Sequence, residues 1–163
     1  MAKRDNSKEV FGKVKAALKE LSDRPPQSLG KEAVSLIKDR TRDGFGVNTK
    51  GGVKHSLKAL SKAYIERRKR SRLHADTSPA KSNLTFSGQL LNSLRSVVEG
   101  SQVLVYPQGN RRGKGPDNLA VAGYVEKAGR AFLNFSAKEI KALVKFYETT
   151  VLSKSLKAKG LTK

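Results

Sequence analysis

Apolar residues return at helical spacing in the first part of the chain. Over Lys8–Leu21 they lie three or four positions apart with lysine and glutamate between them: Val10, Val14, Ala17, Leu18 and Leu21. This spacing predicts an amphipathic helix, which the run Arg24-Pro25-Pro26 ends. A second amphipathic helix is expected from a cap at Ser28 to just before Gly44.

The middle of the chain carries the clearest β signal. The stretches Val97-Val98 and Val103–Tyr106 are rich in β-branched residues and flank a turn at Gly100. This arrangement predicts an antiparallel hairpin that Pro107 ends. Before it, a helix opened by Ser87 or Gly88 is expected, and three leucines form its apolar face: Leu90, Leu91 and Leu94.

The last third alternates between turns and apolar segments. Residues 118–129 predict a short helix capped by Asn118 and ended by Gly129, although their apolar start, LAVAGYV, is also typical of a buried strand. The next apolar run, AFLNF, predicts a strand. After it, Ser136 and Glu139 have the spacing of a capping box, which predicts a long helix packed over the sheet.

These elements predict one α+β domain over residues 1–163, in which a small antiparallel sheet packs with several helices. Flexible basic ends are expected at about residues 1–7 and 153–163, and the arm before Val10 is a candidate for reaching neighbouring molecules. Long glycine-rich loops are expected as well. The one over Asp43–Gly52 is predicted to be mobile and to serve in assembly, through Gly44, Phe45, Gly46, Gly51 and Gly52.

Positive charge dominates the composition. The chain has 34 Lys and Arg against 14 Asp and Glu, a net charge of +20, which favours polyanions or acidic protein surfaces as partners. Two clusters are candidates for contact with nucleic acid or an acidic partner: Arg67, Arg68, Lys69, Arg70 and Arg72, and then Arg111, Arg112 and Lys114. A short helix capped by Ser61 is expected to run into the first cluster. The competing interpretation is that they are solvated surface charges. Because few aromatic residues accompany them, nucleic acid would be held by its backbone and not read by sequence.

Catalysis finds little support in the residues. There is no cysteine, and the two histidines, His55 and His74, lie in no metal-ligand spacing. The pair His74 and Asp76 is interpreted as two polar loop residues. The glycines complete neither a P-loop nor a dinucleotide fingerprint. We therefore expect no enzyme, no cofactor and no metal, and a nuclease is a distant alternative. No apolar run is long enough to span a bilayer, and no signal peptide is apparent, so no membrane partner is expected.

Four segments carry a resemblance to a known family. They are LIKDRTRDGFGVNTKGGVK (Leu36–Lys54), LKALSKAYIERRKR (Leu57–Arg70), SNLTFSGQLLNSL (Ser82–Leu94) and VAGYVEKAGRAFLNFSAKEIKAL (Val121–Leu143). In this order the chain resembles the tail-completion, or neck, proteins of tailed bacteriophages, a group related to virion morphogenesis and minor tail components. Many relatives have prolines around the L-S helix, where this chain has Ala59 and Lys62.

The resemblance implies a non-enzymatic structural protein of the virion. Such a subunit would be made in the cytoplasm of the bacterial host and would form part of an oligomeric ring in the tail or neck region. Its partners would be further copies of itself, the head-tail connector, the tail tube or terminator proteins, and the genome DNA in the channel. The alternative is a basic protein that contacts the phosphate backbone of nucleic acid without sequence readout.

Overall fold

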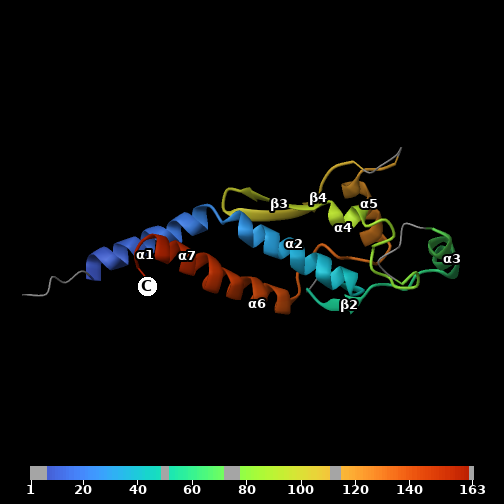
Figure 1. The fold of residues 1–163 in the computed structure, drawn as a ribbon, viewed down its shortest axis with the longest axis horizontal. Helices are drawn as coiled ribbons and strands as arrows, with labels where there is room; N and C mark the ends of the chain where they lie inside the picture. Colours follow the sequence, from blue (N-terminus) through green and yellow to red (C-terminus); the bar gives the residue numbers. More distant parts are fainter. Residues whose placement is uncertain (1–6, 49–51, 72–77, 111–114, 162–163) are drawn as a thin grey trace, which may run out of the picture.

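The computed structural model describes residues 7–48, 52–71, 78–110 and 115–161 (Figure 1). The fold is elongated, and helix α2 (Gln27–Arg42) forms its central element. The strands β3 (Leu94–Glu99) and β4 (Gln102–Pro107) pack along one side of α2, and helix α6 (Ala137–Phe146) packs along another. The predicted α+β class is confirmed, with two separate two-stranded antiparallel sheets in place of one small sheet.

The predicted hairpin is confirmed and is longer than the sequence indicated. Its register pairs Glu99 with Gln102 across the turn and Leu94 with Pro107 at the open end. Helix α4 (Gln89–Asn92) is correspondingly short, so the prediction that Leu94 is helical is wrong. Leu94 is nevertheless buried, because the change from helix to strand at Ser93 keeps its side chain on the core side.

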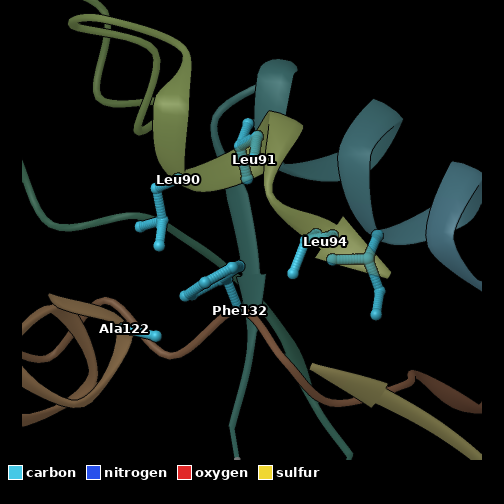
Figure 2. Packing of buried hydrophobic residues seen from close by; sticks show 6 residues of the cluster. Leu90, Leu91, Leu94, Ala122 and Phe132 are labelled. Atoms are coloured by element: carbon cyan, nitrogen blue, oxygen red, sulfur yellow. The ribbon is translucent and has the colours of Figure 1, made fainter. Parts of the chain in front are cut away.

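The hydrophobic core lies where α2, α4, β3 and α5 (Asn118–Lys127) meet. Figure 2 shows Phe132 between the leucines that α4 and β3 contribute and Ala122 of α5. The fully packed cluster is small: Ile37, Leu90, Leu91, Leu94, Ala122 and Phe132. Phe132 belongs to the segment AFLNF, for which the strand prediction is wrong, since residues 131–135 form no strand and place an aromatic ring in the core instead.

The expectation for the C-terminal helix needs two corrections. The helix continues from α6 through a π-helical turn, η2 (Tyr147–Leu152), into α7 (Ser153–Ala158), so the predicted flexible tail is helical up to Ala158. It packs along α2 and α1 (Ser7–Asp23) and not over a sheet. The helix ends in a regular cap, in which the N–H groups of Gly160 and Leu161 donate to carbonyls of α7, and Gly160 has φ +68°.

Two helices have caps that lie one or two residues before the predicted ones. Pro26, and not Ser28, precedes the first residue of α2. Helix α5 is capped by Asp117, whose side chain accepts from the N–H of Ala120 at 2.7 Å. The side chain of Asn118 is therefore released from capping. Gly129 follows the helix with φ +76°, as predicted, and the alternative of a buried strand is wrong.

The glycine-rich segment Asp43–Gly52 contains one strand of a hairpin. Strand β1 (Phe45–Val47) pairs with β2 (Lys54–Ser56), so the prediction of one long mobile loop is wrong for Phe45–Val47, and residues 49–51 lie outside the described part of the chain. Position 46 requires glycine, because a Cβ there would lie 2.2 Å from the carbonyl oxygen of Ala131. The N–H of Val47 donates to the same oxygen at 3.1 Å. The absent side chain therefore lets β1 lie against the segment that carries Phe132.

Within the described ranges, none of the helices has the length and apolar character required to cross a membrane.

Candidate binding pocket around Arg68

The basic run forms helix α3 (Lys62–Arg70) at one end of the molecule (Figure 1). Ser61 caps it as predicted, and its hydroxyl accepts from the N–H of Tyr64 at 3.3 Å. The helix divides the cations between two environments. Arg67, Lys69 and Arg70 are exposed, whereas Arg68 is 1% exposed. The interpretation of the run as a uniform charged surface is therefore wrong for Arg68.

One of the exposed cations is already paired. The ammonium of Lys69 lies 2.7 Å from a carboxylate oxygen of Glu66, one turn earlier on α3. This hydrogen bond and the charge of Lys69 hold the pKa of Glu66 below its ordinary value. Arg67 lies over the ring of Phe86, with its Cζ 6.0 Å from the ring centroid. The surface of α3 thus offers less unpaired charge than the sequence indicates.

Arg68 is only partly satisfied inside the protein. Its Nη1 donates to the carbonyl oxygen of Lys81 at 2.7 Å. Its Nε and Nη2 are buried and have no hydrogen-bond partner in the described part of the chain, where no carboxylate pairs with the guanidinium either. Each buried donor without a hydrogen bond lowers the stability of the folded state by about 1–3 kcal/mol, so such a group calls for an explanation.

Arg68 lines a pocket of about 750 Å³ between α3, the segment before α4, and α5. The volume lies within the range of ligand sites, roughly 300–1,000 Å³. Most of the wall is apolar and comes from distant parts of the sequence: Leu60, Tyr64, Leu84, Phe86, Val121 and Val125. The charged part of the wall consists of three cations, Lys58, Arg68 and Arg130, and includes no carboxylate.

Hydrogen bonds to one carbonyl group fix the rim of this pocket. The carbonyl oxygen of Lys58 accepts from the hydroxyl of Ser82 at 2.7 Å and from Nε of Arg130 at 3.2 Å. Arg130 also donates to the carbonyl oxygen of Ala59 at 3.1 Å. The wall residue Leu84 has φ +55°, a conformation that costs a leucine about 1–3 kcal/mol and that recurs at binding sites.

A second basic hollow, of about 410 Å³, lies between α2 and β3. Lys31, Lys38 and Arg95 line it. Burial, followed by the charges of Arg95 and Arg42, lowers the pKa of Lys38 from its ordinary value of 10.5. The hollow is smaller than the Arg68 pocket.

The other predicted site residues divide into two groups. Arg72, Arg111, Arg112, Lys114 and Gly51 lie outside the described residues, so nothing tests their roles. The remaining residues of the predicted assembly loop, Gly44, Phe45, Gly46 and Gly52, lie in or beside the β1–β2 hairpin. Gly46 is buried against Ala131 and is not available to a neighbouring molecule.

Sequence reasoning missed most of the pocket. Leu84, Phe86, Val121, Val125 and Arg130 were not singled out. Only apolar character would have indicated the first four, and only positive charge would have indicated Arg130. The described residues contain no group of three or more His, Asp or Glu side chains placed to bind a metal ion.

The chain has no match among protein-family models, curated proteins or solved structures.

Proposed function

We propose that the chain is a structural subunit of a tailed-bacteriophage virion, part of the ring that joins head to tail. The observation that carries this proposal is the uncovered apolar face of α6. Ile140 is 51% exposed and Val144 is 50% exposed, and the helix buries no residue completely. Apolar residues that repeat at helical spacing and stay exposed are typical of a surface that another protein covers.

Helix α1 also leaves apolar residues exposed. Phe11 is 71% exposed and Leu18 is 45% exposed, although the spacing of Leu18 predicted an inward position. Figure 1 shows α1 at one end of the molecule, where it lies against η2 and α7, the continuation of α6. The protein therefore resembles a subunit whose burial is completed by its neighbours, as in an oligomer.

The segments that carry the family resemblance also contact one another. The N–H of Leu57 donates to the carbonyl oxygen of Gly44 at 2.8 Å, which joins the first segment to the second. Ser82 of the third segment and Arg130 of the fourth both donate to the carbonyl oxygen of Lys58 in the second. The quoted motifs are thus parts of one connected region.

The test is to determine whether the protein assembles and where it is located. Analytical ultracentrifugation of the purified protein, alone and mixed with connector and tail-tube proteins, should reveal a closed ring or its incorporation into one. Immuno-electron microscopy of virions should place the chain at the head-tail junction. A protein that stays monomeric in every mixture, or virions without it at that junction, would contradict the proposal.

Nucleic-acid binding is the second candidate, and the exposed guanidinium groups of Arg67 and Arg70 on α3 favour it. This function predicts an affinity for duplex DNA that falls steeply with salt, because each phosphate contact releases counterions. A titration at about 50 mM and 200 mM salt measures the slope. Negligible binding at the lower concentration would exclude this candidate.

A further inference from the structure

The guanidinium of Arg68 lies at the wall of a largely apolar pocket with two of its nitrogen atoms unpaired. Nε and Nη2 have no hydrogen-bond partner among the described residues. Both atoms are closed to solvent and the side chain is 1% exposed, so an anion in the pocket reaches them only when part of the pocket wall moves. An arginine in this situation can form two parallel hydrogen bonds to a carboxylate or a phosphate. The geometry therefore indicates an anionic group as the missing partner.

The charge around the pocket favours the same conclusion. Lys58, Arg68 and Arg130 line it together, and no acidic side chain of the described chain does so. Nε and Nη2 of Arg130 donate to backbone carbonyls at the rim of the pocket, and its positive charge still acts on an entering ligand. An entering anion would meet three positive charges and no competing carboxylate.

The apolar residues of the wall indicate what kind of group accompanies the anion. Leu60, Leu84, Val121 and Val125 offer aliphatic contacts, and the rings of Tyr64 and Phe86 lie 5.8 Å apart at 54°. A nucleic-acid backbone has no apolar group to fill such a space. A peptide in which an acidic residue is flanked by leucine or phenylalanine supplies both the anion and the apolar body.

We infer that this pocket is a docking site for an acidic, apolar peptide segment of a partner protein, whose carboxylate binds Arg68. The apolar neighbours of that carboxylate occupy the space between α3 and α5. The inference is independent of the virion role proposed above, because it concerns one pocket and one ligand chemistry. It also explains why the fold keeps an incompletely satisfied arginine in a buried position.

The test compares two peptides of the same shape on the full-length protein. Acetyl-LFEL-amide carries the carboxylate, and acetyl-LFQL-amide replaces it with a neutral amide. Titrations followed by NMR of methyl-labelled protein report on Leu84, Val121 and Val125. We expect saturable shifts at these methyl groups and about tenfold or more tighter binding of the glutamate peptide, since hydrogen bonds between charged groups are the stronger class. Equal affinity of the two peptides would overturn the inference.

Two variants identify the residue responsible. Arg68→Met removes the guanidinium and keeps an unbranched side chain, and it should abolish the preference for glutamate. Arg70→Met removes the same charge from an exposed position of α3 and should retain the preference. Preserved methyl spectra of the β3–β4 hairpin establish that each variant is folded. An unchanged preference in folded Arg68→Met would contradict the assignment.

A short DNA duplex serves as the third ligand. If the duplex shifts the pocket methyl groups and the glutamate peptide does not, the pocket is a nucleic-acid site and the inference is wrong. If the duplex affects only the exposed face of α3, the two surfaces are separate, as we expect. This comparison needs no variant and remains decisive even if Arg68→Met fails to fold.

Discussion

The guanidinium of Arg40 lies 2.7 Å from the carboxylate of Glu139, across 99 positions of sequence. Arg40 is almost fully buried, and it also donates to the carbonyl oxygens of Phe132 and Asn134. Glu139 is at the same time the acidic member of the capping box with Ser136. One ion pair thus holds the start of α6, the central helix α2 and the core segment together.

Loss of this ion pair should strongly destabilise the fold. Arg40→Met leaves the largely buried carboxylate of Glu139 without its cation and two carbonyl oxygens without their donor, and we expect it to reduce the free energy of unfolding by about 3–5 kcal/mol. Urea denaturation followed by circular dichroism measures the difference. Arg42→Met removes an exposed charge from the same helix and should cost less than about 1 kcal/mol. Equal effects of the two substitutions would show that the ion pair contributes nothing specific.

Two glycines should respond to alanine in opposite directions. Gly46→Ala places a methyl group 2.2 Å from the carbonyl oxygen of Ala131, and both segments belong to the packed interior. We expect a loss of about 3 kcal/mol or more, because the backbone there cannot shift freely. Gly12→Ala lies in α1 with no atom within 4 Å and should stabilise the protein by about 0.5–1 kcal/mol. Thermal unfolding of both variants tests the pair, and a tolerated alanine at position 46 would contradict the close approach.

Substitutions on α6 should separate assembly from folding. Because Ile140 and Val144 are each about half exposed, their replacement by glutamine should cost less than about 1 kcal/mol each. The double variant Ile140→Gln/Val144→Gln should nevertheless lose the ability to form or join an oligomer, as measured by analytical ultracentrifugation. Lys141→Gln/Lys145→Gln changes exposed positions of the same helix and is the matched control. Normal assembly of the first double variant would exclude this face as the interface.

The ion pair on α3 predicts a pH effect of known sign. The pKa of Glu66 lies below its ordinary value of 4.5, because Lys69 donates to its carboxylate and so favours the charged form. A lowered pKa in the folded state contributes stability above the unfolded pKa, and this contribution is lost as the pH falls through the folded pKa. NMR titration of the Glu66 carboxyl carbon should show the lowered midpoint. In Lys69→Met the midpoint should rise, and an unchanged midpoint would refute the pairing.

Local signals in the sequence predicted local structure well. The cap of α3 at Ser61, the capping box at Ser136 and the β3–β4 turn each depend on residues a few positions apart, and each is confirmed. The prediction of Asn118 as the cap of α5 is wrong, because the neighbouring Asp117 caps the helix. The amide of Asn118 was needed elsewhere, to hold the carbonyl groups of Gln108 and Gly109.

Features that depend on distant segments could not be predicted in this way. In the sequence, Arg68 cannot be distinguished from its exposed neighbours. Residues of a distant segment, among them Lys81 and Phe86, lie against it in the fold. Gly46 was interpreted as part of a mobile loop, because residues near it in sequence do not indicate that the carbonyl group of Ala131 packs against it. The helical tail after Ser153 was missed for the same reason, since the ion pair between Lys159 and Glu20 spans 139 positions.

The side chain of Asn118 joins the first residue of α5 to the residues that follow β4. Its amide donates to the carbonyl oxygens of Gln108 and Gly109, and its own N–H donates to Gly109 at 3.3 Å, so the two ends of residues 110–117 are tied together at the base. For a loop closed in this way, doubling the length adds only about 0.6 kcal/mol of closure entropy. The position is therefore suited to an inserted epitope or reporter peptide, which would leave the core and the Arg68 pocket unchanged.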